Sequence, residues 1–180
     1  SKKKKYYFVP LQTRDDFQVS AHSKFPTIEA FVETVIYSFA NFAPKNTHLV
    51  IKHHPLDRGR KDYKQDITTL AQALGVRERV LIIYDLHLPT CLKNAIGTIT
   101  INSTVGISSL YHHIPTIALG RALYDIEGLT CKDMRLDDFW ENNRPPEREL
   151  FEKFRRYLIA QTQLNGGFYG RFPTELEEKA

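Results

Sequence analysis

Several polar side chains that can bind a phosphate group lie within one stretch of seven residues. Lys52, His53, His54 and Arg58 follow a compact apolar run, and Pro55 comes directly after His54. Cationic groups and directed N–H donors bind phosphate oxygens through charge-assisted hydrogen bonds. We therefore expect an anion-binding loop here. A loop that leads into a helix and holds one buried histidine is an equally good interpretation.

The two histidines do not predict a metal site. His53 and His54 are adjacent, so their rings point apart, and no aspartate or cysteine stands at a standard ligand spacing from them. We expect neither a metal nor a bound cofactor.

A second polar segment follows another apolar run. Asn102, Ser103 and Thr104 stand where an expected strand turns into an expected helix, with Gly106 one turn further on. Hydroxyls and backbone N–H groups at such a turn bind anions well. Ser103 or Thr104 would cap the helix in either case, because capping and ligand binding are compatible.

Polar residues after the remaining strands are candidates for contacts to a base, a ribose or a sugar. Side-chain amides, hydroxyls and carboxylates can exchange hydrogen bonds with sugar hydroxyls, although a simple surface turn is almost as good an interpretation of the segment 124–128. These candidates are Gln12, Tyr84, Asp85, Tyr124, Asp125 and Glu127.

The elements that must position these residues alternate along the chain. Alternating strands and helices predict a doubly wound, Rossmann-like α/β fold with a parallel sheet, whose ligands bind at the carboxyl ends of the strands. Pro10 confines the first strand to a strand end or a sheet edge, and Val80 to Tyr84, the most continuous apolar run, predicts a central strand covered on both faces. The expected strands are 6–11, 48–52, 80–84, 97–102 and 115–119, and the expected helices are 28–42, 63–74, 88–95, 104–112, 137–140 and 146–164.

Composition fits an ordinary globular domain. The 180 residues are 42% hydrophobic and 26% charged, and the net charge of +4 includes the run Lys2 to Lys5, so a nucleic-acid surface is not expected. Widely spaced Cys91 and Cys131 indicate reduced thiols and a cytoplasmic location. We expect a linker or domain boundary at 1–5, a nucleotide-sugar-binding domain at 6–145, and a C-terminal helix and tail at 146–180.

Three loops taken in order resemble the capsule polysaccharide biosynthesis family of the KpsS/LipB type. They are Ile51 to Gly59, Ile101 to Gly106, and Leu119 to Thr130, within a similarity that runs from the first strand to the segment Asp137 to Trp140. The resemblance implies a GT-B glycosyltransferase that transfers Kdo from CMP-β-Kdo to a phosphatidylglycerol-type lipid. This chain would be the C-terminal, donor-binding half, with the CMP-sugar as substrate.

The resemblance also implies roles for individual residues. The His-Pro pair of CMP-sugar transferases matches His54-Pro55, so His54 would contact the donor phosphate and assist departure of CMP as the catalytic residue of this half. Ser103 and Thr104 would bind the phosphate or the Kdo carboxylate. The acceptor and the catalytic base would belong to an N-terminal half.

The expected partners follow from the same resemblance. They are a nucleotide sugar, a lipid or glycolipid acceptor bound through the N-terminal half, and the capsule assembly machinery at the inner face of the cytoplasmic membrane, where the protein would sit peripherally. Two alternatives remain at this point: a UDP-sugar-binding GT-B enzyme such as an epimerase, and a non-catalytic domain that binds a nucleotide or a partner.

Overall fold

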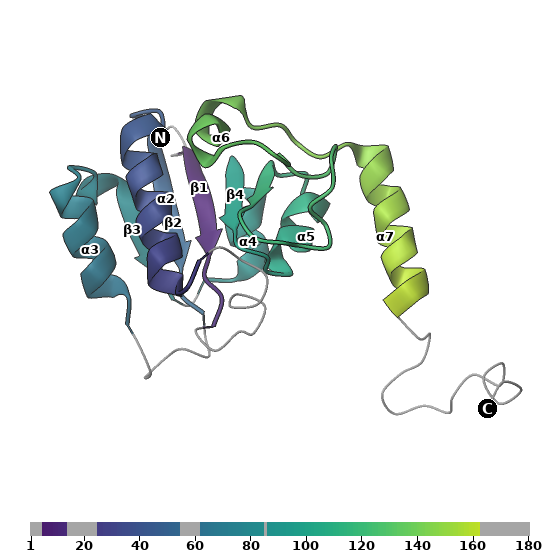
Figure 1. Cartoon of the computed structure of the whole chain (residues 1–180), viewed down its shortest axis with the longest axis horizontal. Coiled ribbons are helices and arrows are strands. Elements are labelled where there is room, and N and C mark those ends of the chain that lie inside the picture. The colour runs from purple at the N-terminus through teal and green to yellow at the C-terminus, as the bar shows by residue number, and fades with distance from the viewer. Residues whose placement is uncertain (1–4, 14–24, 55–61, 85, 163–180) are drawn as a thin grey trace, which may run out of the picture.

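A five-stranded parallel sheet forms the centre of the fold (Figure 1). The computed structural model describes residues 5–13, 25–54, 62–84 and 86–162. The strand order is β3-β2-β1-β4-β5, and every pairing is parallel. The strands are β1 (Lys5–Pro10), β2 (Thr47–Lys52), β3 (Val80–Ile83), β4 (Gly97–Thr100) and β5 (Thr116–Ala118).

Helices cover both faces of this sheet, which confirms the doubly wound α/β fold. The alternation of β1 shows it: Tyr7 and Val9 pack into the large core with α2, α3 and α6, whereas Phe8 packs with Cys91 and Leu92 of α4 on the other face. The helices are α2 (Ile28–Phe42), α3 (Lys64–Ala73), α4 (Leu88–Lys93), α5 (Val105–Tyr111), α6 (Leu136–Asn142) and α7 (Arg148–Thr162), with a short 3-10 turn, η2 (Arg77–Arg79), before β3.

Local sequence signals set the ends of α2 and α3. The Thr27 hydroxyl accepts a hydrogen bond from the Ala30 N–H at 3.2 Å, which confirms Thr27 as the N-cap of α2. The helix ends at Phe42, and its C-cap Ala43 directly precedes Pro44, the expected stop. Gly75 follows α3 with φ of 69°, a left-handed conformation that glycine adopts without strain.

Aromatic packing joins α6 to the sheet. The Trp140 ring meets Tyr7 and Phe39 edge-on, at centroid distances of 4.8 and 5.5 Å. Its indole N–H donates to the Ser38 hydroxyl at 2.8 Å, and that hydroxyl donates to Asp137 at 2.6 Å. The Tyr7 hydroxyl donates to the Trp140 carbonyl. The polar atoms of this buried cluster are therefore satisfied, as burial requires.

The position predicted for the strand at 80–84 is wrong. β3 is an edge strand, and β1, which ends at Pro10, lies at the centre of the sheet. The α4 crossover from β3 to β4 packs on Phe8 and leaves Leu81 44% exposed beside a hollow of about 500 Å³. A continuous apolar run indicates a buried strand, but it does not distinguish a strand covered by helices from one at the sheet edge.

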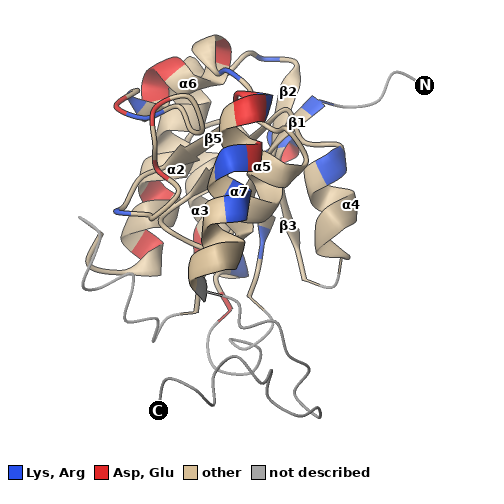
Figure 2. Ribbon diagram, turned by 90° about the vertical axis from the view of Figure 1, so that its right-hand side faces the viewer, with Lys and Arg blue, Asp and Glu red and all other residues tan. Residues whose placement is uncertain are grey.

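α7 lies beyond α5 at one end of the molecule (Figure 1). Its apolar side packs through Phe151 and Phe154 against Leu110 and Leu129, while Figure 2 shows Lys, Arg, Asp and Glu along the same helix. Among the described residues, no helix is long and apolar enough to cross a membrane.

Candidate functional site

The carboxyl edge of the sheet contains the point where the chain reverses its direction of winding. β2 and β3 lie on one side of β1, and β4 and β5 lie on the other. The loops after β1 and β4 therefore diverge, and such a switch point is where doubly wound folds bind ligands.

Gln12 and Asn102 join the two strands at this switch point. The Gln12 side-chain amide donates to Asn102 Oδ1 at 2.9 Å, and the Asn102 backbone N–H donates to Gln12 Oε1 at 3.3 Å. Gln12 is only 6% exposed. Both residues were expected to contact ligand. In the structure, Gln12 joins the end of β1 to the end of β4 through these two hydrogen bonds.

Ser103 lies in the turn that leads into α5. Its hydroxyl accepts a hydrogen bond from the Val105 N–H at 3.2 Å, and its own N–H donates to the Thr100 hydroxyl at 3.3 Å. The Ser103 side chain is half-buried, whereas Thr104 is exposed at the edge. Thr104 holds the N-cap position of α5 but makes no side-chain capping hydrogen bond and is exposed, whereas the Ser103 hydroxyl bonds the first N–H of the helix.

Tyr124 lies beneath this turn rather than on the surface. Its side chain is 1% exposed, and its hydroxyl donates to the Ser103 carbonyl at 2.6 Å. Burial raises the pKa of Tyr124, so the phenol keeps its proton and remains a donor. The expectation that Tyr124 contacts base or sugar directly is wrong, because the buried ring has almost no surface to offer a ligand.

His53 and His54, adjacent in sequence, occupy different environments. The His53 ring is 3% exposed and lies between Tyr63 and Tyr84, with centroid distances of 5.3 and 5.4 Å. Its Nδ1 lies 3.1 Å from the His54 carbonyl oxygen. His54 is half-buried. Lys52 reaches along the same edge and donates to the Tyr84 carbonyl at 3.4 Å.

Asp62 is a member of this group that the sequence interpretation missed. It accepts hydrogen bonds from the Tyr84 hydroxyl at 2.8 Å and from the Lys64 N–H at 2.9 Å. These bonds hold its pKa below the usual range, the Lys64 N–H contributing most. Burial, and secondarily Asp62, raises the pKa of Tyr84. Asp62 directly precedes the helix expected at 63–74, and an aspartate at that position is a capping signal that would have found it.

Asp125 and Glu127 lie in the loop between β5 and α6. Asp125 accepts a hydrogen bond from the Thr130 hydroxyl at 2.6 Å. Glu127 borders a separate hollow of about 350 Å³ that also contains Cys131, whose N–H donates at 2.8 Å to the carbonyl of Thr116, the first residue of β5. Glu127 was expected to contact a base, ribose or sugar, and the structure places it beside this separate hollow because the chain has turned back along β5 by this point. Pro55, Arg58 and Asp85 lie outside the described residues.

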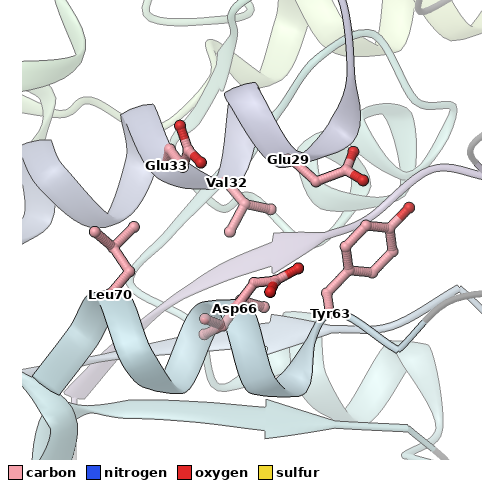
Figure 3. Close-up of a pocket in the computed structure, with 7 residues that line it drawn as sticks. Glu29, Val32, Glu33, Tyr63, Asp66 and Leu70 are labelled. Atoms are coloured by element: carbon pink, nitrogen blue, oxygen red, sulfur yellow. The ribbon is translucent and has the colours of Figure 1, made fainter.

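A small acidic hollow of about 100 Å³ lies between α2 and α3 (Figure 3). Glu29, Glu33 and Asp66 border it, and Tyr63 stands at one end. Carboxylates repel phosphate, so this hollow does not suit a nucleotide. Within the described parts of the chain, no group of three or more His, Cys, Asp or Glu side chains is placed to hold a metal ion.

Comparison with known proteins decides the family. Residues 1–169 match the family described as capsule polysaccharide biosynthesis protein. The chain belongs to this family. The capsule polysaccharide modification protein LipB of Neisseria meningitidis serogroup A is 43% identical over 95% of the chain and 41% of its own length. The capsule polysaccharide export protein KpsS of Escherichia coli is 44% identical over 92% of the chain and 42% of its own length. The chain thus spans less than half the length of these relatives.

Solved structures share the fold. The β Kdo 2,4 transferase of Thermosulfurimonas dismutans KpsC superposes with a TM-score of 0.56 at 21% identity, over 86% of this chain and 44% of that one. The β Kdo 2,7 transferase of the same protein gives a TM-score of 0.58 at 19% identity, over 92% and 47%.

Proposed function

We propose that this chain binds the nucleotide-sugar donor, CMP-Kdo, of a capsule polysaccharide glycosyltransferase. The observation that carries the proposal is the convergence of half-buried His54, exposed Thr104 and half-buried Ser103 at the carboxyl edge, around a switch point fixed by Gln12 and Asn102. Family membership and a fold shared with two Kdo transferases support the choice of donor.

Each residue at the edge has a part in this proposal. His54 donates to the donor phosphate and stabilises the charge that grows on CMP as it departs, as a catalytic residue. Ser103 and Thr104 bind the phosphate or the Kdo carboxylate, and Lys52, together with Arg58, adds positive charge. Tyr84 and Asp85 border the ribose and base. His53, Tyr63 and Asp62 hold the His54 segment in place.

The remainder of the reaction belongs to another part of a longer enzyme. An inverting transfer needs a carboxylate base beside the acceptor hydroxyl, and we place that base and the lipid or glycolipid acceptor in the N-terminal half of a GT-B enzyme. This chain alone should then lack transferase activity. Robust turnover by this chain alone would overturn the assignment of the base and the acceptor to the N-terminal half. The enzyme would work at the inner face of the cytoplasmic membrane with the capsule export machinery.

Titration of the 180-residue chain with CMP tests the donor site. We expect millimolar CMP to shift amide resonances at residues 53, 54 and 102–106 and to leave those at 127–132, at the other end of β5, unchanged. UMP should bind more weakly than CMP. Shifts confined to 127–132, or no shift at all, would contradict the assignment, and a preference for UMP would favour a UDP-sugar enzyme.

A pair of histidine variants sharpens the same experiment. His54→Ala should weaken CMP binding roughly tenfold, because it removes one charge-assisted hydrogen bond. His112→Ala is the control: His112 is also half-buried, but it stands at the far end of α5. Equal weakening by both substitutions would remove His54 from the site.

A further inference from the structure

Tyr124 connects α7 with the turn that follows β4. Its ring packs in one cluster with Leu110 of α5 and with Phe151 and Phe154 of α7. Its hydroxyl reaches the Ser103 carbonyl, 21 residues earlier in the chain, at 2.6 Å. A residue in the β5–α6 loop thus touches the edge of the candidate site from below.

The hydroxyl acts on one particular peptide group. The Ser103 carbonyl accepts two hydrogen bonds, one from the Tyr124 hydroxyl and one from the Gly106 N–H at 2.9 Å. A trans peptide is planar, so the N–H of Thr104 in the same group points opposite to that carbonyl. Because Tyr124 holds the carbonyl from the buried side, the Thr104 N–H is directed away from the interior.

The ring adds a steric constraint. Gly106 lies so close to Tyr124 that a Cβ atom there would clash with the Cζ and hydroxyl oxygen of the phenol. The turn therefore cannot rotate towards Tyr124, and the hydroxyl prevents the Ser103 carbonyl from rotating away. Both contacts restrict the same turn.

We infer that Tyr124 is a positioning residue for the donor site: it fixes the Ser103–Thr104 peptide so that the Thr104 N–H faces the phosphate or carboxylate of the donor. The inference rests on the proposed function for its ligand. Through the Tyr124 ring, α7 would thus support the site although it lies outside the carboxyl edge.

The chain offers a closely matched control in Tyr7. Tyr7 is also buried, at 2% exposure, and its hydroxyl also donates to a backbone carbonyl, that of Trp140. That carbonyl belongs to α6, away from the turn at 103–106. Tyr124→Phe and Tyr7→Phe thus each delete one buried hydroxyl and keep the ring, and a merely structural effect should appear in both.

The test combines a ligand-free readout with a ligand readout on the 180-residue chain. Tyr124→Phe should speed amide hydrogen exchange at Val105 and Gly106, whose N–H groups bond to Ser103, at least about fivefold relative to Tyr7→Phe, as the loss of one hydrogen bond of ordinary strength would. It should weaken CMP binding about fivefold, whereas Tyr7→Phe should leave CMP binding within about twofold of wild type.

The outcomes separate the inference from the proposed function. If wild type binds CMP and the two variants bind it equally, the positioning role is wrong. If wild type does not bind CMP, the proposed donor is wrong, and hydrogen exchange alone tests the role of Tyr124. Selective acceleration at Val105 and Gly106 then supports the contact between Tyr124 and the turn, and equal exchange in both variants overturns it.

Discussion

The turn after β4 and the segment after β2 reach the same edge of the sheet but are held there by different forces. The β4 side is held by directed hydrogen bonds, which run from the Gln12 amide to Asn102, from the Val105 N–H to the Ser103 hydroxyl, and from the Tyr124 hydroxyl to the Ser103 carbonyl. On the β2 side, His53 is packed between two tyrosine rings, and the Tyr84 hydroxyl bonds to exposed Asp62.

This difference indicates that the β4 side and the β2 side have different tasks. Hydrogen bonds to backbone groups fix the orientation of a peptide, which suits a preformed site for an anion. Packed rings fix the position of a segment. The neighbouring residue, half-buried His54, is then available for the proposed hydrogen bond to the donor phosphate. Substitutions on the β4 side should therefore act mainly through structure, and those at His54 mainly through chemistry.

The largest effect should come from Gly106→Ala on the β4 side. The added Cβ would clash with the buried Tyr124 ring, and overpacking of this kind costs about 1–3 kcal/mol and occasionally more. We expect about 3 kcal/mol of destabilisation in urea unfolding. Ser108→Ala on the same helix is the control and should change stability by less than about 0.5 kcal/mol. A stable Gly106→Ala protein would show that the turn is adaptable.

Next in size is the effect of His54→Ala in a full-length enzyme that contains this chain. Loss of a charge-assisted bond that tightens as CMP departs should lower kcat roughly ten- to a hundredfold at saturating donor, for a bond of about 1.5–3 kcal/mol. Thermal melting should remain near that of wild type.

His53→Ala gives the complementary result. It removes a buried ring between Tyr63 and Tyr84, so melting should fall and turnover should stay closer to normal. If His54→Ala retained wild-type turnover, the proposed chemical role of the β2 side would fail.

Gln12→Ala should have a smaller effect. It removes two hydrogen bonds, one to the Asn102 side-chain oxygen and one from the Asn102 backbone N–H, and the loss of such a pair costs about 1–2 kcal/mol. Gln65→Ala, which removes one weak exposed contact of 3.5 Å to Thr69, should cost under about 0.5 kcal/mol. Equal unfolding midpoints for the two variants would show that the link between β1 and β4 adds nothing.

The smallest effect concerns the pH dependence from Asp62. The folded state lowers its pKa, so its contribution to stability is present above its unfolded value of about 3.9 and is lost as pH falls through the folded value. The group is exposed, and the contribution should stay below about 0.5 kcal/mol. The difference in melting temperature between wild type and Asp62→Asn should shrink from pH 6 to pH 2.5, and a constant difference would exclude this linkage.

The sequence predicted the elements well because local signals set them. Thr27, Pro44 and Gly75 mark helix ends, and strand-like runs alternate with helical ones. The neighbours of each strand were harder to predict. The run at 80–84 is apolar although β3 lies at the edge of the sheet. An apolar run indicates that a strand is buried, but it does not tell which strands lie beside it.

Prediction of the site was limited in another way. Loop order correctly brought Gln12, His54 and Asn102 to one edge, because parallel strands end there. It could not show which side chains turn inward: Tyr124 is buried beneath the turn, and Glu127 lies by another hollow. Those facts depend on α7 and on the path back along β5, which spacing in the sequence does not encode.

The central position of β1 has a consequence during synthesis. Tyr7 pairs with Leu49 of β2 but also with Gly97 of β4, 97 − 7 = 90 residues later. At roughly 5–20 residues per second, a ribosome needs roughly 5–20 s to deliver that second partner. For this time one edge of β1 stays unpaired on the nascent chain, and an open strand edge is a template for pairing with other chains. The growing polypeptide should thus be most open to chaperone capture before residue 97 emerges.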